Sequence, residues 1–185
     1  MAAPTLAQQP NVDQPSSRSI TDGFELGFKL CFAHIARRGH LAEEHNEMLL
    51  GMGVELAKDV PQKIRESSGP LFKEDRIFAK MRAAGGKMYI LSAKNSTACR
   101  VVLADTIDGL RHRVAFVDRL RETSAWTYDK RRSGTRNGLM RDELTSASGR
   151  AVTIMNGPNY IFNQGNGVQA ILTIALLPPQ NRSSE

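Results

Sequence analysis

Residues 87–104 read KMYILSAKNSTACRVVLA, and this stretch decides the fold class of the chain. It contains two runs, Lys87–Ala93 and Cys99–Ala104, that have the length and the β-branched and aromatic content of β-strands. Helical spacing of apolar residues dominates the chain before this stretch, and short strand-like runs dominate it afterwards. Helices followed by strands indicate an α+β domain with an antiparallel sheet rather than alternating βαβ units.

The predicted helices lie in the first 83 residues. The first helix shows an apolar face at spacings of four, three and four residues: Phe24, Phe28, Cys31 and Ile35. A second apolar series at helical spacing runs through residues 41–56 and ends before Pro61. Residues 71–83 are predicted to form a short third helix, because Leu71, Phe78 and Met81 are spaced by seven and three.

Further strands are predicted in the second half of the chain, separated by Gly- and Asn-containing turns. They are His112–Val117, Thr123–Tyr128, Ala151–Met155, Tyr160–Phe162 and Val168–Leu177. The turn signals are Asp108-Gly109, Asn137-Gly138 and Asn156-Gly157-Pro158. The last run is the most apolar of all, so we expect it in the centre of the sheet.

The two ends of the chain have a different composition from the rest. Residues 1–18 are rich in Pro, Gln, Ala and Ser and have no apolar period, which predicts a disordered N-terminal arm. Residues 178–185 form a similar short tail, which we expect to be flexible. A single α+β domain, with N-terminal helices packed on an antiparallel sheet, is therefore predicted for residues 19–177.

The positive charge of the chain is concentrated in one segment. Of 185 residues, 25 are Lys or Arg and 19 are Asp or Glu, which gives a net charge of +6. Residues 111–141 contain nine of the basic residues and three of the acidic ones, so this segment alone accounts for the whole excess. A concentrated positive field indicates an anionic partner, either RNA or DNA or an acidic membrane surface.

The candidate binding residues all come from this segment: Arg111, Arg113, Arg119, Arg121, Trp126, Tyr128, Lys130, Arg131, Arg132 and Arg136. Guanidinium and ammonium groups would contact phosphates, and the two aromatic rings, on one face of a strand, would stack on bases. The alternative is that Trp126 belongs to the core and the arginines only solvate the surface.

The cysteine and histidine residues near the N-terminus offer two candidate chemical sites. Cys31, His34, His40 and His45 have the composition of a zinc site, but their spacing does not match a recognised zinc pattern. Cys31 and His34 could also serve as a nucleophile and its base, yet no orienting acid or oxyanion signature accompanies them. We therefore expect that the protein binds no metal or cofactor and is not an enzyme. The simpler interpretation of Cys31 is that it is a small side chain buried in the core.

The remaining features concern location and partners. The first residues lack the basic and apolar regions of a signal peptide, and no apolar run is long enough to span a membrane. Two cysteines permit one bridge, which is not the disulfide framework of a small secreted domain. We expect a cytoplasmic or nuclear protein, or a virion component if the protein is viral.

These features together predict a non-enzymatic structural protein that self-associates into a homo-oligomer and binds a polyanion through a basic face. Its layout of polar arm, compact basic α+β core and short tail is similar to that of small viral matrix or coat proteins. One alternative is a regulatory RNA- or DNA-binding protein, such as a silencing suppressor or transcription accessory factor. Another is a small enzyme that uses Cys31 and His34.

Overall fold

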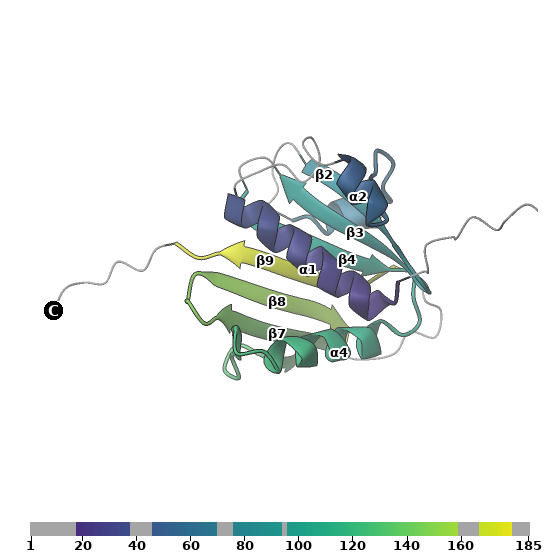
Figure 1. Cartoon of the computed structure of the whole chain (residues 1–185). Coiled ribbons are helices and arrows are strands. Elements are labelled where there is room, and N and C mark those ends of the chain that lie inside the picture. The colour runs from purple at the N-terminus through teal and green to yellow at the C-terminus, as the bar shows by residue number, and fades with distance from the viewer. Residues whose placement is uncertain (1–17, 38–45, 70–75, 94–95, 159–166, 179–185) are drawn as a thin grey trace, which may run out of the picture.

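One antiparallel sheet organises the protein (Figure 1). The structure is a computed structural model that describes residues 18–37, 46–69, 76–93, 96–158 and 167–178. Within these residues nine strands pair in the order β1-β2-β3-β4-β9-β8-β7-β5, and β6 adds to β7. The α+β prediction is confirmed. The predicted arm, apart from Arg18, and most of the predicted tail lie outside the described residues.

The strands of the first half of the sheet follow each other in the chain. They are β1 (Val54–Leu56), β2 (Arg76–Ala83), β3 (Gly86–Ala93) and β4 (Ala98–Ala104). The second half contains β5 (Trp126–Tyr128), β6 (Gly134–Arg136), β7 (Leu139–Ser146), β8 (Ala151–Pro158) and β9 (Val168–Leu176). The strand β9 joins the two halves by pairing with both β4 and β8, so the prediction that this apolar run is central is confirmed.

Helix α1 (Ile20–Arg37) crosses one face of the sheet, as Figure 1 shows. Its predicted apolar stripe is confirmed, since Phe24, Cys31 and Ile35 are completely buried against the strands. Ser19 caps the helix, because its hydroxyl accepts a hydrogen bond from the Asp22 amide at 3.2 Å. The helix approaches β4 closely at Gly27, where an added Cβ would lie 2.7 Å from the Val101 side chain.

Helix α4 (Gly109–Arg121) covers the same face beside α1 (Figure 1). The prediction of a strand at His112–Val117 is therefore wrong, and Asp108-Gly109 begins the helix instead of forming a hairpin turn. The buried residues Arg113, Phe116, Val117 and Leu120 are spaced as i, i+3, i+4 and i+7. The sequence of α4 does have a helical period, but the buried face begins with the charged residue Arg113. A charge at this position kept the face from being recognised as apolar in the sequence.

Two of the predicted N-terminal helices also differ in the structure. The segment predicted as a third helix contains strand β2, in which Ala79 and Met81 face α1 whereas Phe78 packs on the opposite side. Within its described residues, 46–56, the second series forms α2 (Asn46–Gly51), and Gly53, with a φ of 71°, leads from this helix into edge strand β1. Pairing with β3 overrode the helical spacing of the β2 sequence.

Strand β8 extends through the predicted turn Asn156-Gly157-Pro158. It pairs with β7 over seven residues and with β9 over six, so the prediction that this tripeptide ends the strand is wrong. The partner strand predicted at Tyr160–Phe162 lies outside the described residues. The Asn137-Gly138 prediction is confirmed, because both residues have positive φ angles, 51° and 72°, in the turn between β6 and β7.

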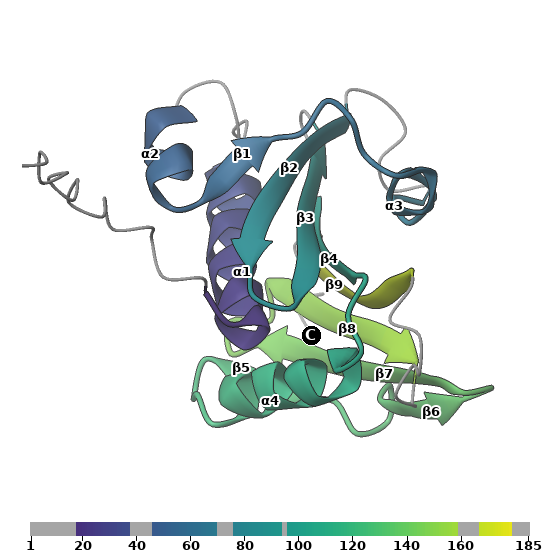
Figure 2. The same cartoon turned by 90° about the vertical axis from the view of Figure 1, so that its right-hand side faces the viewer.

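The opposite face of the sheet is covered only in part by the described residues. The short helix α3 (Gln62–Glu66) lies on this side, across the sheet from α1 (Figure 2). Its Ile64 packs with Tyr89, Leu91 and Val102 in a second, smaller apolar cluster. The rest of this face, over β7 and β8, is where Arg131, Arg132 and Arg136 of the predicted basic residues gather.

Arg100 of β4 attaches the end of α3 to the sheet. Its Nη1 donates to the carbonyl oxygens of Ser67 and Ser68, and its Nε donates to Thr173 Oγ1 at 3.1 Å. Burial lowers the pKa of this arginine below its ordinary value. The contacts place a cation at the carbonyl end of the helix, where it satisfies otherwise unpaired oxygens.

We expect Arg100→Met to lower the free energy of unfolding by about 2 kcal/mol, because it removes hydrogen bonds donated by a charged group. The amides of Ser67 and Ser68, which bond to Lys63 and Arg65 carbonyls, should exchange hydrogen faster. Urea unfolding and amide exchange measure the two effects. Arg82→Met, at an exposed position on β2, is the matched control and should change neither quantity.

A disulfide joins the two layers of the protein. Cys31 of α1 and Cys99 of β4 are bonded to each other, 68 residues apart in the sequence, and both are completely buried. The prediction that Cys31 is buried is confirmed. The single disulfide that two cysteines permit is formed. None of the helices in the described parts of the chain is both long and apolar enough to cross a membrane.

Candidate polyanion-binding surface

The turn between β5 and β6 presents basic residues because Asp129 fixes its backbone. One oxygen of the Asp129 carboxylate accepts hydrogen bonds from the amides of Arg131, at 2.9 Å, and Arg132, at 3.2 Å. The Asp129 carbonyl accepts a further bond from the Ser133 amide. This arrangement is a side-chain-stabilised turn of the kind that Asp favours. It holds the stretch Lys130–Arg132 at the protein surface, where all three side chains are exposed.

The β6–β7 hairpin continues this surface toward the open sheet face. Gly134–Arg136 pairs with Leu139–Arg141 across the Asn137-Gly138 turn. Alternation along β7 then places Arg141, Glu143 and Thr145 on the side of the sheet opposite α1, whereas Asp142 and Leu144 face the helices. The same alternation places Ile154 and Asn156 of β8 beside them, directly opposite Glu143 and Arg141.

These residues surround an open hollow of ≈ 1100 Å³, which we call the basic hollow. Its cationic side chains are Arg131, Arg132, Arg136 and Arg141, and its carboxylate is Glu143. Its apolar residues are Leu139, Met140, Val152, Ile154 and Leu177. Four guanidinium groups against one carboxylate give the hollow a net charge of +3.

Glu143 orders two of the four arginines. Its side chain is only 2% exposed, and its two oxygens accept from Arg132 at 3.0 Å and from Arg141 at 2.5 Å. The hydrogen bond from Arg132 raises the pKa of this guanidinium above its ordinary value. Since both arginines remain largely exposed on their outer side, each still has donors directed at solvent.

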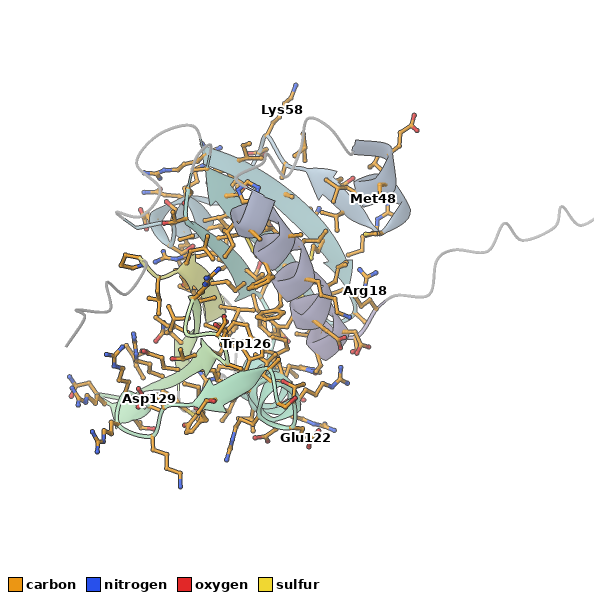
Figure 3. All side chains as sticks on the ribbon, turned by 60° about the vertical axis from the view of Figure 1, so that its left-hand side comes forward. Arg18, Met48, Lys58, Glu122, Trp126 and Asp129 are labelled. Atoms are coloured by element: carbon orange, nitrogen blue, oxygen red, sulfur yellow. A yellow bond between two sulfur atoms is a disulfide. The ribbon has the colours of Figure 1, made fainter. Side chains whose placement is uncertain are left out.

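The other two arginines of the hollow, Arg131 and Arg136, are exposed and have no carboxylate partner among the described residues. The same holds for Lys130 at the tip of the turn. In Figure 3, nitrogen-tipped side chains extend outward around Asp129. An unneutralised charge at the surface is the group that gains most when it meets a phosphate.

The arginines of α4 lie elsewhere and are engaged in ion pairs. Arg119 contacts Asp22 at 2.9 Å and Glu25 at 3.2 Å on α1. The hydrogen bonds from Ser19 and then Arg119 hold the pKa of Asp22 below its ordinary value. Arg111 lies 3.6 Å from Asp108 and Arg121 lies 3.3 Å from Asp118. The structure does not unite these three residues with the basic hollow.

The predicted position of Arg113 at the surface requires a correction. The residue is completely buried beneath α4, so it cannot contact a ligand from the surface. No hydrogen-bond partner for its guanidinium is found within the described ranges, and burial lowers its pKa, with the charge of Asp142 acting in the opposite direction. The sequence placed this residue on an exposed strand, whereas the helix turns it toward the sheet.

The two aromatic residues also require a correction. Trp126 packs edge-on against Phe28, with ring centroids 5.4 Å apart, and against Phe32 at 6.3 Å. In Figure 3 it lies among the side chains beside α1. Tyr128 donates its hydroxyl hydrogen bond to Asp142 at 3.0 Å, and the guanidinium of Arg121 lies over its ring. Both rings pack against the core cluster on the helix-covered face, so they do not line the basic hollow.

Sequence reasoning missed Arg141 and Glu143 as site residues. Arg141 belongs to the same basic segment, and that position in the segment is the signal that could have identified it. Glu143 could not be identified, because its role depends on the fold of the turn around it. The basic hollow therefore retains Arg131, Arg132 and Arg136 of the predicted set, with Lys130 beside it.

The structure also bears on the zinc-site and nucleophile hypotheses for Cys31 and the nearby histidines. The Cys31 sulfur is committed to the bond with Cys99, so it is not a thiolate nucleophile in this structure. His34 is buried on the same helix, and His40 and His45 lie outside the described residues. Over the described ranges, no cluster of three His, Cys, Asp or Glu residues has metal-binding geometry.

Comparisons with known proteins do not identify a family for this chain. No protein-family model, no curated protein sequence and no solved structure matches the chain.

Proposed function

We propose that the protein is a non-enzymatic structural protein that binds nucleic acid through the basic hollow and self-associates on it. The observation that carries the proposal is the set of four guanidinium groups around the hollow, which with Glu143 gives a net charge of +3. Two of these guanidinium groups have no carboxylate partner in the described structure. Arginine presents five N–H donors in a fork that matches phosphate oxygens. Binding would proceed by release of counterions from the phosphates.

The shape of the site favours a nucleic-acid strand over a membrane surface. A lipid headgroup layer is flat, whereas these arginines border a hollow between the β6–β7 hairpin and strand β8. Apolar side chains such as Ile154 and Met140 line it and can contact sugars or bases. Since the contacts would be made mainly to phosphates, we expect little sequence preference.

Assembly and location belong to the same proposal. A virion matrix or coat role requires many copies on one polyanion, as homo-oligomers or larger assemblies. The buried disulfide favours the virion among the expected locations, because disulfides persist on virion surfaces and are rare in the reducing cytosol. A regulatory binding protein would use the same arginines but would discriminate strongly among ligands.

The proposal predicts a large loss of affinity on charge reversal within the basic hollow. Arg131→Glu/Arg136→Glu should weaken binding of a fluorescently labelled 20-nucleotide single-stranded RNA at least about tenfold, because two phosphate contacts become repulsive. Fluorescence anisotropy at fixed salt measures the effect. The matched control is Arg111→Glu/Arg121→Glu on α4, which changes the net charge equally.

Equal losses in the two double variants would contradict the basic hollow as the binding site. Size-exclusion chromatography with light scattering, run with and without the RNA, tests the structural role. Large assemblies that form with RNA of any sequence support it. Discrete complexes with strong preference for one RNA or DNA would favour the regulatory alternative instead.

A further inference from the structure

A second pocket lies on the same side of the sheet as the basic hollow, where α3 covers β3 and β4. It has a volume of ≈ 310 Å³, which is at the lower end of the range for small-molecule sites. Ile64 and Val168 form apolar walls, and the polar side chains that line it are Lys63, Lys87, Tyr89 and Asp105. None of its residues lines the basic hollow, so the two sites are separate.

Tyr89 supplies a hydroxyl donor to this pocket. The residue is only 4% exposed, and no hydrogen bond joins its hydroxyl to another described residue. The hydroxyl is not one of the fully buried polar atoms without a partner, so it reaches the open space of the pocket. Burial raises the pKa of the phenol above its ordinary value, so the hydroxyl keeps its proton and can donate. A hydroxyl that no protein group engages can donate to a ligand in the pocket.

The charge of Asp105, the acidic residue of the pocket, is already balanced by Lys87. One oxygen of Asp105 accepts from Lys87 at 2.9 Å, and the other accepts from the Gly167 amide at 3.0 Å. The hydrogen bond from Lys87, followed by that from Gly167, holds the pKa of Asp105 below its ordinary value. This carboxylate therefore remains ionised and positions Lys87 at the edge of the pocket.

Lys63 leaves the pocket with a surplus positive charge. Its ammonium lies 3.8 Å from the position that a Cβ on Gly167 would occupy, so it reaches over the pocket from α3. No carboxylate pairs with Lys63 in the described part of the chain. Two ammonium groups and one hydroxyl donor against one occupied carboxylate suit a ligand with several acceptor oxygens and negative charge.

We propose that this pocket binds a phosphate monoester, whose three terminal oxygens accept from Lys63, Lys87 and Tyr89. The organic part of the ligand packs on Ile64 and Val168. A phosphate fits these donors better than a carboxylate, because a carboxylate has only two oxygens to share among three donors.

The phosphate could be carried by a free nucleotide or by the 5′ end of a nucleic-acid strand. Tyr89 and Arg141 stand in one row of paired residues, which runs from β3 to β7 through Val102, Ile171 and Asn156. Four strand spacings separate them, or about 19 Å along the sheet. A strand held in the basic hollow could therefore place its end in this pocket.

Two binding comparisons test the inference and distinguish the sources. Calorimetry compares adenosine 5′-monophosphate with adenosine, and anisotropy compares 5′-phosphorylated with 5′-hydroxyl RNA of one sequence. In at least one comparison the phosphate should increase affinity about tenfold, since it adds charge-assisted hydrogen bonds. A gain with the monophosphate identifies free nucleotide as a ligand, and a gain with RNA alone identifies the strand end.

Two variants connect the gain to the pocket. Lys63→Ala and Tyr89→Phe should each reduce the gain about fivefold or more, whereas Lys58→Ala, at an exposed position outside the pocket, should leave it unchanged. Thermal unfolding of Tyr89→Phe verifies that the variant is folded. Absence of any phosphate effect in both comparisons, or a gain that both variants retain, would overturn the inference. Binding of 5′-hydroxyl RNA reports on the basic hollow alone, so the two proposals can fail independently.

Discussion

The Cys31→Ala/Cys99→Ala variant is expected to unfold with a free energy about 4 kcal/mol lower than that of the wild-type protein. The bond closes a loop of 68 residues, and a long loop restricts the unfolded chain strongly. Because the bond joins α1 to β4, its loss should also loosen the packing of the helix on the sheet. Urea unfolding at 25 °C measures the difference.

The wild-type protein in dithiothreitol is the matched control for the cysteine variant. Reduction breaks the same bond without removing side-chain volume, so the reduced protein should lose nearly as much stability as the variant. The reductant should leave the variant unchanged. Coincident unfolding curves of the oxidised and reduced wild-type protein would show that the bond does not stabilise the fold.

Asp142→Ala is expected to lower the free energy of unfolding by about 2–3 kcal/mol. Asp142 is 3% exposed and supplies the opposite charge for the fully buried Arg113, and burial raises its pKa. Its removal leaves a guanidinium buried without compensation and deprives the Tyr128 hydroxyl of its acceptor. Denaturant unfolding of the variant gives the size of the loss.

A double variant separates charge from packing at this position. Arg113→Met/Asp142→Leu replaces both charges by apolar side chains, so it should recover most of the stability that Asp142→Ala loses. The Arg113→Met variant alone should be destabilised, because it leaves the carboxylate buried without its cation. A double variant no more stable than Asp142→Ala would contradict the account in which the two buried charges compensate each other without direct contact.

The fold could be predicted in class and in several elements because its patterns are local. The stripe of α1, the strands β3 and β4 and the central position of β9 follow from spacing and composition alone. The helix α4 was predicted as a strand, because its buried face begins with Arg113, and a charge does not mark a core position. Strand β2 was predicted as a helix, because its apolar residues are shared between two covered faces.

The candidate site could be predicted only as a segment. The concentration of charge indicated Arg131, Arg132 and Arg136, and the structure brings these three residues to one hollow, while their role in binding stays a prediction. Trp126 and Tyr128 were placed wrongly, because the strand alternation that puts them on one face does not say which face the helices cover. Glu143 escaped prediction, since an acidic residue in a basic segment acquires its role only through the tertiary contacts it makes.

The salt dependence of RNA binding tests the central claim most directly. Anisotropy titrations between low and moderate salt should give a slope of log affinity against log salt of about −3 for single-stranded RNA, as expected for four phosphate contacts. In Arg131→Gln/Arg136→Gln the slope should fall to about half, because two of those contacts are lost. An affinity that is flat with salt, or a slope that the double variant leaves unchanged, would contradict binding through the basic hollow.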